Sequence, residues 1–129
     1  NMGFQFNGTQ ANVTISGGIS MTTPTPASTQ TVINVETTGN NSDVTLYTVP
    51  ANKRFILTSV WIMYNNVNSF TVYKPDGTTI LASIRTHENQ PSSNLSPSTP
   101  IWIYAAGEAV KGGANNGAAI GIIGILEDV

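Results

Sequence analysis

Short runs of apolar and β-branched residues recur about every ten residues from position 31 to the end of the chain, and turn-forming residues separate them. Runs of this length, bounded by Gly, Pro, Asn and Asp, are typical of β-strands. No window shows the 3.6-residue period of a helix with capping residues at its ends. The pattern therefore predicts strands at 31–36, 44–48, 54–64, 69–74, 79–86, 101–105 and 118–126.

Prolines, glycines and asparagines mark the connections between these runs. Pro50-Ala-Asn-Lys53 and Pro75-Asp-Gly77 place proline where a type I turn accepts it. The proline- and serine-rich segment 87–100 predicts a long surface loop, and the glycine-rich segment 111–117 predicts a flexible one. Short strands with this spacing predict an all-β fold, a single jelly-roll or Greek-key β-sandwich of about 7–8 antiparallel strands.

The first thirty residues differ from the rest of the chain. Segment 21–28 contains two prolines and no run long enough for a core strand, which indicates a linker. Apolar and polar residues alternate at 4–6 and 13–15, on either side of Asn7-Gly8, as in a small hairpin or an arm that adds strands to a neighbour. We expect an N-terminal extended arm with a Thr/Pro-rich linker at 1–30 and the β-sandwich domain at 31–129.

The predicted strand 54–64 has apolar residues on both of its faces. Simple alternation places Phe55, Leu57, Trp61 and Met63 on one side and Ile56, Val60, Ile62 and Tyr64 on the other. An antiparallel sandwich strand normally has one wet face, and segments 101–104 and 120–126 depart from that rule in the same way. A subunit interface would cover the second face; the alternative is a cover formed by residues 1–30 or by the long loop of the same chain. The candidate interface residues are Ile56, Val60, Ile62, Tyr64, Ile122 and Leu126.

Charged residues are few, at 9% of the chain, with a net charge of -2. Solubility is left to 17 Thr, 14 Asn and 11 Ser, a composition that also favours strands and loops over helices. Five scattered lysines and arginines form no basic patch, which argues against a nucleic-acid partner. No apolar run is long enough to cross a membrane, so no membrane partner is expected, and without cysteine the chain has no disulfide framework.

The residues that could carry catalysis are sparse. His87 is the only histidine, and the carboxylates stand singly near predicted turns or strand ends. A general acid–base pair or a zinc site needs partners that this pattern does not supply. We therefore predict that the chain is not an enzyme, with no catalytic residue, no metal site and no cofactor. Exposed aromatic rings are better candidates for recognition, and Trp102 and Tyr104, which border the long loop, are the candidate contacts for a receptor or glycan.

Three segments carry a resemblance to a known family. Segment 44–60, with Thr48-Val-Pro-Ala-Asn-Lys53 before an apolar strand, resembles the Thr-Val-Pro-Ala-Gly-Lys pattern of phage and virus virion proteins, such as tail-fibre, spike or capsid-decorating β-sandwich domains. Segment 103–110 is similar to the turn that introduces the penultimate strand of that pattern, and 121–126 to its closing strand. Asn52 stands where glycine is usual, and Ala106-Gly-Glu108 replaces the usual Gly-Asp form.

The resemblance implies a virion structural protein, a capsid, spike or tail-fibre component located on a virion surface or outside cells. It also implies a homo-oligomer, in particular a trimer, with other virion proteins as further candidate partners. A host-surface glycan is a candidate partner on other grounds, namely the weakly charged surface and the aromatic residues near the long loop. The alternative function is a monomeric carbohydrate-binding module of a secreted protein, in which segment 21–28 is the linker to the rest of that protein.

Overall fold

The computed structural model describes residues 29–129, which form nine β-strands. No helix in this range is long and apolar enough to cross a membrane. The predicted arm and linker at 1–30 fall almost wholly on residues 1–28, outside the described range. The strands are β1 (Thr31–Thr38), β2 (Val44–Thr48), β3 (Lys53–Met63), β4 (Asn68–Tyr73), β5 (Ile80–Thr86), β6 (Ser92–Leu95), β7 (Trp102–Tyr104), β8 (Ala109–Gly113) and β9 (Ala119–Asp128).

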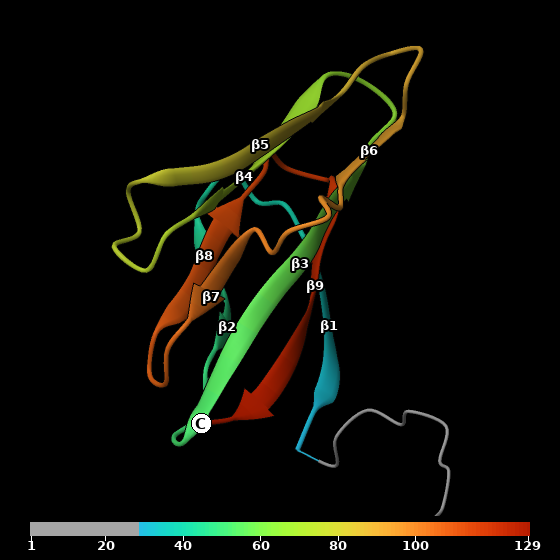
Figure 1. Ribbon diagram of the computed structural model, residues 1–129. Helices are drawn as coiled ribbons and strands as arrows, with labels where there is room; N and C mark the ends of the chain where they lie inside the picture. Colours follow the sequence, from blue (N-terminus) through green and yellow to red (C-terminus); the bar gives the residue numbers. More distant parts are fainter. Residues whose placement is uncertain (1–28) are drawn as a thin grey trace, which may run out of the picture.

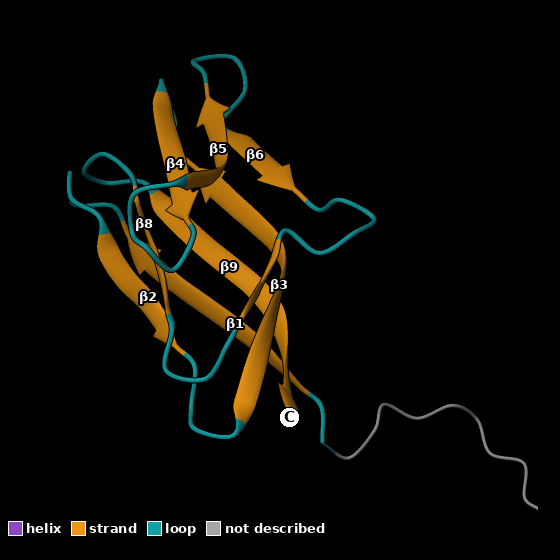
Figure 2. Ribbon diagram, turned by 60° about the vertical axis from the view of Figure 1, so that its left-hand side comes forward, coloured by secondary structure: helices purple, strands orange, loops and turns teal. Residues whose placement is uncertain are grey.

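The strands form two antiparallel sheets that pack face to face (Figure 1). The first sheet has the order β1-β9-β3-β6, with β7 also paired to β3, and the second has the order β2-β8-β4-β5. Figure 2 shows the same two layers from another side, with β9, β3 and β1 in one and β2, β8 and β4 in the other. The predicted all-β sandwich of the jelly-roll type is confirmed.

The core lies between the sheets and consists mainly of apolar side chains. Phe55, Leu57 and Ile62 from the first sheet are in one buried cluster with Phe70 and Val72 from the second. Full burial of side chains of this size contributes roughly 1.5–3 kcal/mol each. Strands β3 and β9 pair along nearly their whole length, from Lys53–Asp128 to Met63–Ala119, with one shift of register between them.

A β-bulge in β3 changes which of its side chains reach the core. The pairing of β3 with β9 shifts by one residue between Leu57 and Ser59. A bulge inserts one extra residue, so the side chains beyond it exchange faces. Val60 and Ile62 consequently point inward with Phe55 and Leu57 and are buried, whereas Trp61 and Met63 point outward. The sequence-based assignment of faces was therefore wrong beyond the bulge.

Two strands lie where the sequence pattern predicted loops. β6 (Ser92–Leu95) pairs with β3 inside the predicted long loop 87–100, although it consists mainly of small polar residues. β8 (Ala109–Gly113) includes the start of the predicted glycine-rich loop. Its glycines are needed for close packing: a Cβ atom on Gly113 would lie 2.3 Å from the carbonyl oxygen of Ser42, and one on Gly112 2.6 Å from that of Thr71.

The turn between β2 and β3 holds a residue other than glycine in the left-handed region. Asn52 has a φ of 64°, which asparagine adopts more readily than most residues other than glycine. Asn52 therefore suits a backbone position at which glycine is also favoured. The turn carries the chain from the second sheet to the first.

Candidate functional site

The outer face of the first sheet carries a line of apolar side chains. In the register of β1, β9, β3 and β7, the residues Val32, Ile125, Ile56 and Ile103 lie side by side in one line across four strands, which we call the apolar row. Val32 is 70% exposed and Ile103 is 49% exposed, while Ile125 and Ile56 are half-buried and lie outside the core cluster. No described segment covers this row, so the structure presents it to solvent.

Trp61 and Met63 extend the apolar surface toward the other end of β3. The indole of Trp61 lies over Gly121 of the neighbouring strand, where a Cβ atom would come within 2.4–2.5 Å of the ring. Met63 is 56% exposed. Together with Ile123, which also points outward, these residues and the apolar row form what we call the apolar face.

Charged groups border the apolar face at the end of β9. Arg54 and Glu127 form an ion pair, as do Lys53 and Asp128. The Gln30 side chain also donates to Glu127, with an N–O distance of 2.9 Å. These hydrogen bonds, first from Gln30 and then from Arg54, lower the pKa of the Glu127 carboxyl. At this end of the face the charges are therefore paired, whereas Glu36 lies on the same face beside Gly121.

The predicted interface residues separate into two groups in the structure. Val60, Ile62 and Ile122 are at most 1% exposed inside the chain's own sandwich, and Tyr64 and Leu126 pack against that core. The burial of Val60, Ile62 and Ile122 rules out an intersubunit contact for these three side chains, because the bulge in β3 and the register of β9 turn them inward. Ile56 does lie on the outer face. Counting alternate residues cannot reveal a bulge, so the pattern did not place Val32, Ile103, Ile123 and Ile125 on that face.

The two predicted receptor contacts also differ. Tyr104 is fully buried, and its hydroxyl donates to the backbone carbonyl of Tyr73 in the second sheet at 2.7 Å. It cannot meet a ligand, which corrects that assignment. Trp102 is half-buried, packs against the core, and has the ammonium of Lys74 at 4.7 Å from its ring centre. With Pro100, Ile101 and Ile103 it lines a shallow apolar pocket of about 500 Å³.

The outer face of the second sheet is polar. Strand register aligns Thr45, Lys111 and Tyr73 across β2, β8 and β4, and Thr71 with Ser83 across β4 and β5. The hydroxyls of Thr71 and Ser83 form a hydrogen bond of 3.2 Å. We call this surface the polar face, and it contains a hollow.

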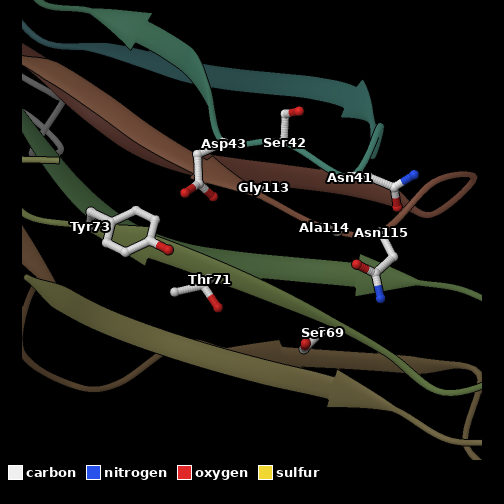
Figure 3. Close-up of a pocket in the computed structure, with 9 residues that line it drawn as sticks. All are labelled: Asn41, Ser42, Asp43, Ser69, Thr71, Tyr73, Gly113, Ala114 and Asn115. Atoms are coloured by element: carbon white, nitrogen blue, oxygen red, sulfur yellow. The ribbon is translucent and has the colours of Figure 1, made fainter. Parts of the chain in front are cut away.

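The polar hollow has a volume of about 220 Å³ and lies where the β1–β2 and β8–β9 loops meet β4 (Figure 3). Figure 3 shows Asp43 and Tyr73 toward one end and Asn41 and Asn115 toward the other. Burial, together with the charge of Asp43 and a hydrogen bond to it, raises the pKa of the Tyr73 phenol, so this phenol stays protonated at neutral pH. The residues that line the polar hollow are Asn41, Ser42, Asp43, Ser69, Thr71, Tyr73, Gly113, Ala114 and Asn115.

Asparagine side chains fix the two loops that form the hollow. The backbone N–H of Asn41 donates to the carbonyl of Ala114 at 3.0 Å, and that of Asn116 to the side-chain oxygen of Asn41 at 2.8 Å. Asn68 is only 2% exposed, and its amide both donates to the carbonyl of Asn115 and accepts from its N–H. These bonds hold the lining in one geometry without a disulfide or a metal.

Among residues 29–129, no group of three or more His, Cys, Asp or Glu side chains could hold a metal ion. His87 lies in a tight turn, where its backbone exchanges two hydrogen bonds of 2.9 Å with that of Gln90.

Comparison with known proteins supports the assignment of the fold. No family model matches the chain, and no curated protein matches its sequence. Among solved structures, it is similar to the nucleoplasmin-like N-terminal domain of Drosophila FKBP39, with a TM-score of 0.51 and 12% sequence identity over 81% of this chain and 96% of that one. At this identity the likeness establishes the fold alone, a nucleoplasmin-like jelly-roll sandwich. That domain is not a virion protein, so the virion family stays a prediction.

Proposed function

We propose that this chain is a non-enzymatic structural domain that assembles with copies of itself through the apolar face, as a component of a virion. The observation that carries the proposal is the apolar row, which is aliphatic in all four strands that it crosses. Soluble monomers rarely keep a continuous apolar surface in water. The sequence resemblance and the low charge favour the virion setting, and the resemblance favours a trimer.

A second copy of the chain fits this face better than a charged partner does. The Arg54–Glu127 and Lys53–Asp128 pairs at the end of β9 offer equal numbers of both signs, and the Glu36 carboxylate lies on the same face beside Gly121. The paired charges can meet a second copy of the chain without repulsion between like charges. Trp61 and Met63 are also residue types that are enriched in protein interfaces. Burial of the exposed parts of Val32, Met63 and Ile103 would add about 1 kcal/mol or more for each side chain.

The oligomeric state of the full chain tests the proposal. Sedimentation velocity over a range of concentrations should detect an oligomer. A double variant, Val32→Lys and Ile103→Lys, should raise the dissociation constant of the oligomer at least about a hundredfold, because two lysines would be brought into an apolar contact. Both positions are about half exposed or more, so the lysines can reach water in the free subunit.

The matched control places two lysines at exposed strand positions on the second sheet, Thr45→Lys and Thr48→Lys. This variant should assemble as the unmodified chain does. A chain that stays monomeric at all accessible concentrations would contradict self-assembly and favour the monomeric carbohydrate-binding module. Equal dissociation of both variants would show that added charge, and not the apolar face, is responsible.

A further inference from the structure

We propose that the polar hollow binds a single neutral sugar unit of a glycan. The hollow lies on the sheet opposite to the apolar face, so self-assembly through that face would leave it open to solvent. The inference is independent of the self-assembly, and either can fail without the other. It also replaces Tyr104, which is buried, as the predicted point of glycan contact.

The lining offers hydrogen-bond donors and acceptors in close alternation. Hydroxyls come from Ser42, Ser69, Thr71 and Tyr73, and side-chain amides come from Asn41 and Asn115. Each sugar hydroxyl both donates and accepts, and so requires partners of both kinds within one small site. Figure 3 shows the Asp43 carboxylate and the Tyr73 hydroxyl at one end of the hollow and the Asn115 amide at the other, so a ring lying between them could be held from both ends.

The charge of the lining excludes strongly charged ligands. No lysine, arginine or histidine lines the hollow, so a phosphate or sulfate group would find no cation. Asp43 is the single carboxylate of the lining, whereas calcium sites typically combine several charged oxygen ligands. A neutral, hydroxyl-rich ligand remains the chemical class that the lining matches.

The size of the hollow sets the length of the ligand. Its 220 Å³ equal the volume of about seven water molecules, which is enough space for one sugar ring. Gly113 lets the β1–β2 loop pack closely on β8 beside the hollow, since a Cβ atom there would collide with the Ser42 carbonyl. The asparagine bonds between the two loops fix the lining before binding, which lowers the entropy lost when a ligand is held.

Titration of the ¹⁵N-labelled full chain with neutral monosaccharides tests the inference. Galactose, glucose, mannose and N-acetylglucosamine are added separately up to millimolar concentrations, and amide chemical shifts are recorded. At least one sugar should cause saturable shifts centred on residues 41–43 and 113–115. Loss of one hydrogen bond to the sugar should raise the dissociation constant about fivefold or more. The variants Tyr73→Phe and Asp43→Asn each test one such bond.

Both substitutions preserve the shape of the lining, and Tyr73→Phe leaves the backbone carbonyl that accepts from Tyr104 in place. Thr45→Ala is the control, because Thr45 lies on the same face outside the hollow. Shifts caused by calcium chloride or sodium phosphate and by none of the sugars would overturn the inference. It would be overturned equally by the absence of saturable shifts with all four sugars, or by affinities that are unchanged in both variants.

Discussion

The outer faces of the two sheets carry opposite chemistry on a shared framework. The apolar row crosses the first sheet with aliphatic side chains only, whereas Thr45, Lys111 and Tyr73 cross the second sheet in the equivalent way. Both sheets bury their inner faces in the same core, so folding of the single domain does not require the difference. We attribute the apolar face to a contact outside the domain and the polar face to recognition in water.

The same contrast holds for the glycines of the two faces of β9. Gly124 points inward, where an added Cβ atom would lie 2.4 Å from the carbonyl oxygen of Ile56 and 2.5 Å from the ring of Phe55. Gly121 points outward, where the three closest atoms belong to the side chain of Trp61. One position is thus confined by backbone and core, and the other by a partly exposed side chain that can move.

The largest effect on folding is expected at Gly124. Gly124→Ala should lower the free energy of unfolding by about 1–3 kcal/mol, because the methyl group meets a carbonyl oxygen that cannot retreat without breaking the β3–β9 pairing. Gly121→Ala should cost less than about 1 kcal/mol, since Trp61 can swing away into solvent or into the intersubunit contact. Urea unfolding followed by circular dichroism measures both values.

Oligomer stability should respond in the reverse order. Gly121→Ala displaces Trp61 and should weaken self-association more than Gly124→Ala does. If Gly121→Ala instead destabilises the fold as much as Gly124→Ala, the outer face of β9 is as tightly constrained as the inner one, and the contrast between the faces is lost.

The fold followed from the sequence more completely than the site did. Alternation and turn residues predicted seven of the strands and the sandwich, because those signals are local. The bulge between Leu57 and Ser59 is not local: it depends on the pairing with β9, where the hydroxyl of Thr58 also donates to the carbonyl of Ile123 at 3.1 Å. Without that partner strand, residues beyond Thr58 could not be assigned to the correct face.

The polar hollow was beyond sequence reasoning for a related reason. Its lining combines residues 41–43 with residues 69–73 and 113–115, and no spacing in the chain connects these three segments. The strand β8 that joins them contains two adjacent glycines, which a propensity argument assigns to a loop. Close contact with Ser42 and Thr71 makes glycine necessary there, and only the packed structure shows those contacts.

Tyr104 provides the next test, because it links the two sheets. Its hydroxyl extends from β7 of the first sheet to the carbonyl of Tyr73 in β4 of the second, and burial raises the pKa of this phenol far above its usual value. Tyr104→Phe should lower the free energy of unfolding by about 1–2 kcal/mol, since it leaves a carbonyl without its partner. Tyr47→Phe is the matched control, as its ring also packs on Phe55, at 5.0 Å, but the residue is partly exposed. A loss of equal size in both variants would assign the effect to ring packing and not to the link between the sheets.

The smallest effect concerns acid stability at the β4–β5 turn of the second sheet. Hydrogen bonds from the Thr79 side chain and from the backbone N–H groups of Thr79 and Thr78 lower the pKa of Asp76 from 3.8 to about 2. Because the folded chain holds this proton less tightly than the unfolded chain does, the ionised carboxylate stabilises the fold above pH 4. That contribution is lost as the pH falls from about 4 toward 2.

Asp76→Asn removes the titrating group and retains one oxygen for the turn. The unfolding temperature of the variant should lie slightly below that of the unmodified chain at pH 6, and the two should converge between pH 4 and 2. Glu127→Gln gives the matched comparison on the first sheet, because hydrogen bonds from Gln30 and Arg54 also lower the pKa of the Glu127 carboxyl. The difference in unfolding temperature between Asp76→Asn and the unmodified chain could instead stay the same at every pH. The Asp76 turn would then act only through its shape, and the ionisation of Asp76 would not contribute to stability.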